Sequence, residues 1–250
     1  MRLFGAMEIH STQTGPLEVN SYILPLAGRA VLLVDPAACE FSGDEKALAQ
    51  ILDEHDCVPV GVLLTHGHFD HVCGIKALRQ SFPNIPIAIH QADQKYLGAA
   101  SRDAHKTLLD GMGFDGEDAF LEELSGLPEA DFLLNDGDLL DSVFKTECVA
   151  GAFTGDEAPD FEAVSNALSH WRVIHTPGHT QGSVCFYNES EGLLISGDTV
   201  FYQSYGRTDL PGGDDGQMQK SLSKIFTELP KSVLVYPGHG AGGFELGANE

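Results

Sequence analysis

Short apolar runs separated by polar, glycine-containing stretches organise this chain and predict a series of β-strands. Most of these runs are rich in Val, Ile and Leu and end in a turn. The predicted strands cover Glu18 to Leu26, Ala30 to Asp35, Gly61 to Leu64, Ile85 to His90, Trp171 to His175, Ser183 to Tyr187, Gly192 to Ser196 and Ser232 to Tyr236.

Between these runs, apolar residues recur at helical spacing. A capping-box pattern, Ser42-x-x-Glu45, predicts a helix start before Leu48, and the spacing from Val72 predicts a helix that Pro83 ends. Residues 91–127 are expected to be mainly helical. Asp214 or Asp215 is expected to cap a last helix, which Pro230 ends.

Two stretches do not follow either period. Asp136-Gly137-Asp138 is typical of a hairpin turn. Residues 141–170 contain Gly151, Gly155 and Pro159, which break any periodicity. We expect this segment to be an insertion or flap that overlies or flanks the functional cleft.

Composition narrows the class of protein. The chain has 250 residues, 42% of them hydrophobic, and a formal net charge of −23. Such an acidic chain is repelled by nucleic-acid backbones and anionic membranes, so neither is expected as a partner. The sequence has no signal-peptide pattern and an odd number of cysteines, five, which predicts a cytoplasmic protein.

Potential metal-binding side chains are most concentrated in Thr65-His66-Gly67-His68-Phe69-Asp70-His71, between a predicted strand and a predicted helix. His66 and His68 are two residues apart, so in an extended segment both imidazoles project to the same side. Asp70 and His71 enter the helix and point elsewhere. The turn can therefore serve two metal ions, because imidazole and carboxylate bind zinc, iron or manganese. A solvated loop is the alternative.

Three later turns favour the metal site. Each follows an apolar strand, contains glycine and carries one ligand-type residue: His179, Asp198 or His239. Strands that end at the same sheet edge would bring these groups into one cleft.

In this order, the His-x-His-x-Asp-His motif, His179, Asp198 and His239 resemble the metallo-β-lactamase superfamily over nearly the whole chain outside residues 141–170. The resemblance implies an α/β fold, the four-layer αβ/βα sandwich, as a single domain over residues 1–250. It implies that His66, His68 and His179 hold one metal, that Asp70, His71 and His239 hold a second, and that Asp198 bridges them. Zinc is the expected ion, and iron and manganese are the alternatives.

Within the superfamily, the stretches 176–183 and 206–213 resemble short bacterial glyoxalase II-like proteins. The long type has a helical C-terminal domain that holds glutathione, whereas eleven residues follow His239, so we expect none here. The implied activity is hydrolysis of S-lactoylglutathione or a related small thioester or ester. The alternatives are a persulfide dioxygenase with one iron, and a non-catalytic metal-binding relative.

The expected mechanism uses two ions that share a water and supply hydroxide. Asp70 and Asp198 are the predicted catalytic carboxylates, and Asp70 is expected to orient the nucleophile. Arg207, Tyr202 and Tyr205 are candidate substrate contacts. Asp209 is either a supporting partner for Arg207 or half of an internal ion pair that only holds the loop. The oligomeric state is left open.

Overall fold

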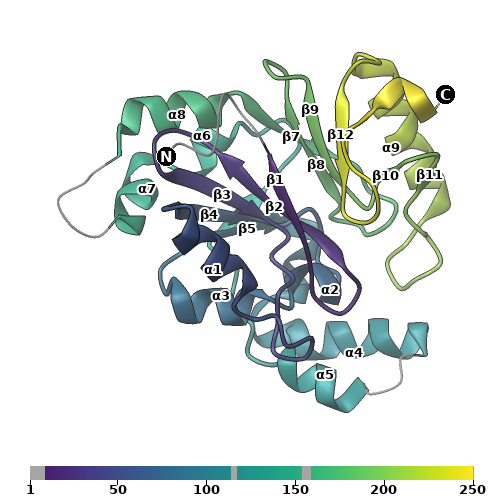
Figure 1. Ribbon diagram of the computed structural model, residues 1–250. Helices are drawn as coiled ribbons and strands as arrows, with labels where there is room; N and C mark the ends of the chain where they lie inside the picture. Colours follow the sequence, from purple (N-terminus) through teal and green to yellow (C-terminus); the bar gives the residue numbers. More distant parts are fainter. Residues whose placement is uncertain (1–8, 114–116, 154–158, 250) are drawn as a thin grey trace.

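The computed structural model describes residues 9–113, 117–153 and 159–249, which form two facing β-sheets between layers of helices (Figure 1). The purple and blue first half of the chain builds one sheet. The green and yellow second half builds the other. In the part of the chain that the structure describes, no helix is both long and apolar enough to cross a membrane.

The first sheet has the strand order β1-β2-β3-β4-β5-β6. β1 to β3 are antiparallel neighbours, whereas β3 to β6 run parallel. The strands are β1 (His10–Thr14), β2 (Val19–Pro25), β3 (Ala30–Val34), β4 (Val58–Leu63), β5 (Ile87–His90) and β6 (Phe132–Leu134).

The second sheet has the order β13-β12-β9-β8-β7, and a separate pair, β10-β11, follows β9. β9 and β12 are parallel, and the other neighbours in the sheet are antiparallel. The strands are β7 (Trp171–His175), β8 (Val184–Asn188), β9 (Leu193–Gly197), β10 (Val200–Phe201), β11 (Ser204–Tyr205), β12 (Leu234–Pro237) and β13 (Phe244–Glu245).

Helices cover both outer faces, which completes the four layers (Figure 1). The first sheet is covered by α1 (Ala47–Glu54), α2 (Phe69–Val72), α3 (Ile75–Ser81), α4 (Ser101–Met112) and α5 (Glu117–Glu123). The second sheet is covered by α9 (Asp215–Glu228), which Asp214 caps. Short 3₁₀ turns span Gln91–Tyr96, Gly98–Ala100 and Leu246–Asn249.

Strand alternation explains why the layers stack. In β3, Val31 and Leu33 pack under the outer helices, whereas Leu32 faces the other sheet. In β8, Phe186 faces the first sheet, and Cys185 packs against the α9 side. β3 and β8 are therefore apolar on both faces, as expected for strands of a sheet that is buried on both sides.

The described part of segment 141–170, which was expected to be an insertion or flap, is mainly helical. It forms α6 (Leu140–Val143), α7 (Thr146–Ala152) and α8 (Phe161–Ser169). Their side chains belong to the core between the sheets, where Phe144 and Leu168 are buried to 1% and 0% exposure. None of the described residues of this segment lines the cavity identified below, and the helices contribute to the core. Residues 154–158 lie outside the described part, and a role of the segment beside the cleft stays a prediction.

Two local predictions were wrong. α1 begins after Lys46 with no side-chain cap, and Ser42, whose hydroxyl donates to Asp44, lies in the turn before the helix. The turn at residues 136–138 is not a hairpin within one sheet. It connects β6 of the first sheet to Leu139, which bridges Arg172 of the second. Polar turn residues mark where a chain bends, but they do not show which strand it will meet.

Candidate metal centre

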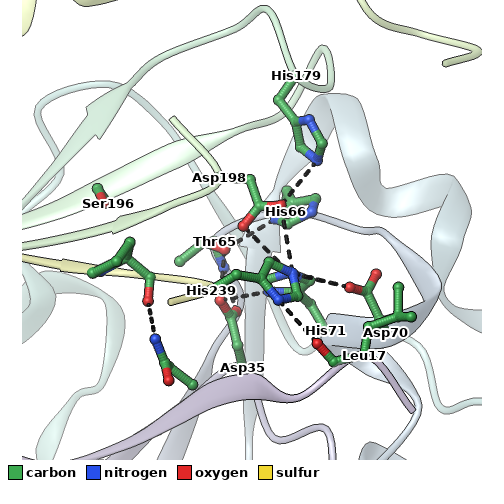
Figure 2. A network of polar contacts seen from close by, with 12 residues as sticks. Leu17, Asp35, Thr65, His66, Asp70, His71, His179, Ser196, Asp198 and His239 are labelled. Carbon is green, nitrogen blue, oxygen red and sulfur yellow. Dashed lines mark hydrogen bonds and ion pairs between the residues drawn. The ribbon is translucent and has the colours of Figure 1, made fainter. Parts of the chain in front are cut away.

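The seven side chains predicted as metal ligands lie together where strands of both sheets end (Figure 2). β4 leads into the loop and helix that carry the first four ligands. β7, β9 and β12 end shortly before the other three. The complete set is His66, His68, Asp70, His71, His179, Asp198 and His239.

Three overlapping groups of these residues could each hold an ion. Within each group the candidate ligand atoms all lie within 4.8 Å of one another. The groups are His66, His68 and His179; His66, His71 and Asp198; and Asp70, His71 and His239.

Hydrogen bonds fix the orientation of four of the five histidines. Thr65 Oγ1 donates to Asp35 at 2.6 Å, so it is free to accept from His66 Nδ1 at 3.1 Å. The Nδ1 atoms of His71, His179 and His239 lie 2.9, 2.7 and 3.1 Å from oxygens of Asp35, Arg207 and Leu17. Those oxygens can only accept, so each Nδ1 carries a proton and Nε2 is the ring atom that remains to bind a metal, as metal-binding histidines require.

The two aspartates lie among these Nε2 atoms. Asp70 Oδ2 is 3.2 Å from His239 Nε2, and Asp198 Oδ2 is 3.4 Å from His179 Nε2. Asp198 Oδ1 is 3.5 Å from His71 Nε2. Asp198 therefore contacts histidines of both groups predicted from the sequence, which places it between them (Figure 2).

Unsatisfied buried atoms show that this cluster suits metal ions. Among the described residues, the Nε2 atoms of His66, His68 and His179 and Oδ1 of Asp198 are buried without a hydrogen-bond partner. A buried polar atom without a partner costs about 1–3 kcal/mol. In addition, the Nε2 atoms of His71 and His239 face each other at 3.3 Å. Divalent cations bound by the ligand sets would satisfy these acceptors, so the residues fit metal ions.

The electrostatics of the metal-free cluster agree with this interpretation. Burial, followed by the neighbouring histidines, holds the pKa of His66 well below its usual value and favours the neutral, ligating form. Burial would also lower the pKa of His71, but Asp70, Asp198 and Asp35 outweigh it and raise this pKa to about 10. Burial opposes ionisation of Asp70, yet His71 and His239 lower its pKa. In the absence of a metal, a proton on His71 therefore compensates the carboxylates.

Two buried aspartates outside the predicted set support the ligand loops. Asp35, directly after β3, receives bonds from the Thr65 backbone and hydroxyl and from His71. Asp93, at 0% exposure, accepts from Gly67 N and Gly182 N at 2.9 Å and from Thr180 Oγ1 at 2.7 Å. Asp35 could have been found from its sequence position, since it also follows an apolar strand. Asp93 carries no such signal.

Close approach of the backbone explains two of the glycines beside the ligands. A Cβ on Gly238 would lie 2.3 Å from Asp198 Oδ1, and a Cβ on Gly206 would lie 1.9 Å from the Asp198 carbonyl oxygen. Any side chain at either position would therefore displace Asp198.

A cavity of about 340 Å³ opens above the cluster. His68, Asp70, His179, Asp198 and His239 lie on its floor, and its walls include Leu17, Phe69, Met112, Phe201, Arg207 and Leu210. Tyr202 and Tyr205, predicted as substrate contacts, do not line it. Tyr202 is 53% exposed and packs against Phe244, and Tyr205 lines a separate depression beside α9.

Arg207 lines the cavity, but its guanidinium is engaged elsewhere. Nε and Nη2 bond the two carboxylate oxygens of Asp209 at 2.7 and 2.8 Å. The internal ion pair left open by the sequence is therefore present. The Arg207 carbonyl holds His179, so the loop also helps to position a candidate ligand.

Comparison with known proteins agrees with the fold and the cluster. The family model described as the metallo-beta-lactamase superfamily matches residues 14–239. The chain belongs to the metallo-β-lactamase superfamily. The superfamily assignment and the four-layer fold predicted from the sequence are therefore confirmed.

Among superfamily relatives, the chain is 29% identical to the probable metallo-hydrolase YqgX of Bacillus subtilis, over 90% of this chain and 87% of that protein. It is 25% identical to the hydroxyacylglutathione hydrolase GloC of Haemophilus influenzae, over 84% of this chain and 79% of GloC.

Two crystal structures are similar along almost their full lengths. The BLEG-1 B3 metallo-beta-lactamase has a TM-score of 0.69 and 28% identity, over 96% of this chain and 95% of that one. TTHA1623, in a di-iron-bound form, has a TM-score of 0.67 and 26% identity, over 96% of each chain.

Proposed function

We propose that this superfamily member is a metal-dependent hydrolase of the glyoxalase II type that cleaves a small thioester or ester, such as S-lactoylglutathione or a relative. The convergence of unsatisfied Nε2 and carboxylate atoms on the cavity floor carries the proposal. The names of YqgX, a probable metallo-hydrolase, and GloC, a hydroxyacylglutathione hydrolase, support it.

Each part of the cluster has a role in this proposal. His66, His68 and His179 form one ligand set, Asp70, His71 and His239 form the other, and Asp198 joins the two. Divalent ions bound there, with zinc first and iron or manganese as alternatives, supply Lewis acidity that activates water and polarises the carbonyl.

The protein's own contribution is orientation. The Nδ1 bonds hold the imidazoles, and Asp70 lines the cavity, where its carboxylate can accept a hydrogen bond from the attacking water and orient it. The proton that the water loses passes to solvent or to the departing sulfur. Water oxygen bonds to the carbonyl carbon and the C–S bond breaks. Because a thiol has a pKa of about 8.5, the leaving thiolate needs little help from an acid.

The experiment combines metal analysis with a thioester hydrolysis assay on the purified protein. We expect up to two zinc or iron ions per chain, and we expect Asp198→Ala to lose metal from both sets together with activity. His170→Ala is the control, because His170 is exposed at the end of α8. Full metal content in Asp198→Ala contradicts the joining role.

A second arm of the assay separates the hydrolase from a persulfide dioxygenase. Oxygen uptake with glutathione persulfide, in place of thioester hydrolysis, would identify the oxidoreductase. The likeness to ETHE1 from Myxococcus xanthus, with 20% identity and a TM-score of 0.61, concerns the fold alone. Bound metal with neither activity would identify a non-catalytic relative.

A further inference from the structure

The walls of the cavity above the metal centre are mainly apolar, whereas a charged substrate would require polar or charged groups there. Five apolar side chains contribute to them, from parts of the chain that are far apart in sequence. They are Leu17, Phe69, Met112, Phe201 and Leu210. A cavity of about 340 Å³ is at the small end of the range of small-molecule sites, which is about 300–1,000 Å³.

Phe69 and Leu210 are 1% and 7% exposed and belong to the core of the first sheet's outer face. They form a fixed back wall. Leu17, in the β1–β2 turn, is 40% exposed, and Met112 and Phe201 are half-buried. These three side chains present apolar surface to whatever enters the cavity. Met112 adds an adaptable side chain that can pack against groups of different shape.

The position of Leu17 ties this apolar wall to the metal centre. Its carbonyl accepts the Nδ1 proton of His239, while its side chain lines the cavity (Figure 2). An apolar group packed on Leu17 is therefore held next to the side chain of a candidate ligand. The β1–β2 turn thus orients a candidate metal ligand and also forms part of the cavity wall.

The charges around the cavity also favour an uncharged, apolar substrate group. Among the described residues that line the cavity, Arg207 is the one cationic side chain apart from the histidines. Its guanidinium already donates two hydrogen bonds to Asp209. The chain as a whole carries a formal charge of −23. Apart from the bound metal ions, a substrate with several carboxylates would have little to bind here, and the charge of the chain would repel it at a distance.

We propose that the substrate of this site carries an uncharged apolar acyl group, aliphatic or aromatic, which packs against Leu17, Met112 and Phe201 while its carbonyl lies over the metal centre. The inference rests on the proposed hydrolase function and narrows it. Hydrophilic acyl groups such as lactoyl, and highly charged thiols such as glutathione, are then poorer substrates, so within the thioesters proposed above the inference favours a relative with an apolar acyl group over S-lactoylglutathione itself.

The test uses thioesters of one small neutral thiol, N-acetylcysteamine, with acetyl, butyryl, hexanoyl and lactoyl groups. Burying one methylene favours the transition state enough to raise kcat/KM about fourfold, so each pair of added methylenes is expected to raise it about 15-fold. The lactoyl thioester is expected to react no faster than the acetyl one. A flat series in the wild-type protein overturns the inference.

Two nearly isosteric variants test whether the increase of kcat/KM with acyl length comes from the cavity wall. Leu17→Asn and Met112→Gln are expected to lower the increase per methylene to about twofold or less, while the metal content stays unchanged. The matched control is Leu133→Asn, because Leu133 is 41% exposed on β6 and does not line the cavity. An unchanged increase in both cavity variants shows that the apolar group binds elsewhere and overturns the inference.

Binding of inert analogues separates this inference from the proposed function. S-butyl and S-hexyl thioethers of the same thiol cannot be hydrolysed, and calorimetry measures their affinity directly. Affinity that increases with chain length, without hydrolysis of any thioester, supports the apolar site and contradicts the hydrolase. Hydrolysis that does not depend on acyl length, with thioether binding equally insensitive, contradicts the apolar site and leaves the hydrolase intact.

Discussion

Asp35 shows how a residue that touches no substrate can govern this centre. Its carboxylate binds Thr65, which orients His66, and it also binds His71 at 2.9 Å. It therefore controls the ring orientation of one histidine from each predicted ligand set. Loss of such a partner typically weakens metal affinity about 10–100-fold.

We therefore expect Asp35→Asn to lower the affinity for metal by about 10–100-fold, because the amide keeps the shape but not the charge or both acceptors. Competition with a zinc-binding indicator measures this affinity. Asp110→Asn is the control, since the Asp110 carboxylate pairs with Lys106 on the surface of α4. Equal affinity in the Asp35 variant and the wild-type protein would show that the ligands orient themselves.

His105 makes a separate prediction about pH. It is fully buried, Nε2 bonds the Tyr96 carbonyl at 2.9 Å, and burial lowers its pKa to about 4. An unfolded histidine has a pKa of about 6.5, so between these values the unfolded chain binds the extra proton. The stability that His105 contributes is present above pH 6.5 and is lost as the pH falls toward 4.

Between pH 7.5 and pH 5, this histidine should reduce the free energy of unfolding by about 2 kcal/mol. His105→Gln should remove that part of the pH dependence, because glutamine does not titrate. Urea unfolding of both proteins at the two pH values, at equal metal loading, gives the difference. The idea is wrong if the two proteins lose the same free energy of unfolding.

At the residue scale, the sequence predicted the seven clustered side chains because their types and order are unusual together. It did not predict the supporting residues. Asp93 lies in an ordinary polar stretch, and its three partners come from loops 26 and 87–89 residues away. Tyr202 and Tyr205 were misplaced for the opposite reason, because closeness in sequence to Arg207 does not fix the direction in which a side chain points.

At the scale of elements, α6, α7 and α8 determine how segment 141–170 should respond to mutation. Leu168 of α8 is at 0% exposure in the core between the sheets. We expect Leu168→Ala to lower the free energy of unfolding by about 2–5 kcal/mol. Because Leu168 does not line the cavity, kcat/KM for a thioester should stay within about twofold of the wild-type value, a change of about 0.4 kcal/mol in activation free energy.

Chemical denaturation and steady-state kinetics measure these two effects. The control is Leu139→Ala, which removes a 42% exposed side chain just before α6 and should be nearly neutral in both assays. A large loss of kcat/KM in the stable fraction of Leu168→Ala would support the hypothesis that this segment serves the cleft.

Element types were predictable where burial on two faces gave long apolar runs, as in β3, β8 and β9. They were harder to predict in segment 141–170, where α6 and α7 have only four and seven residues and where Gly151, Gly155 and Pro159 interrupt any period. Such helices are stabilised by tertiary packing more than by their own propensity. The failed capping box has a different cause, because α1 begins only after Lys46 and Ser42 lies in the turn before it.

At the scale of the whole molecule, the net charge of −23 acts on every approaching substrate. We expect kcat/KM for S-lactoylglutathione, which is anionic, to rise as sodium chloride is increased from 20 to 300 mM, because salt screens long-range repulsion. An uncharged acetyl thioester should show little change. A decrease for the anionic substrate would reveal a local cationic site strong enough to dominate the field of the protein.

The distribution of the ligands between the two sheets has a consequence for biosynthesis. His66 and His68 belong to the first half of the chain, whereas His179, Asp198 and His239 follow strands of the second. A ribosome that has synthesised only the first sheet presents two members of each ligand set, all from one loop. The set of His66, His68 and His179 is complete once synthesis has passed residue 179, whereas the set of Asp70, His71 and His239 is complete only after residue 239, so the second set can bind its metal only near the end of chain growth.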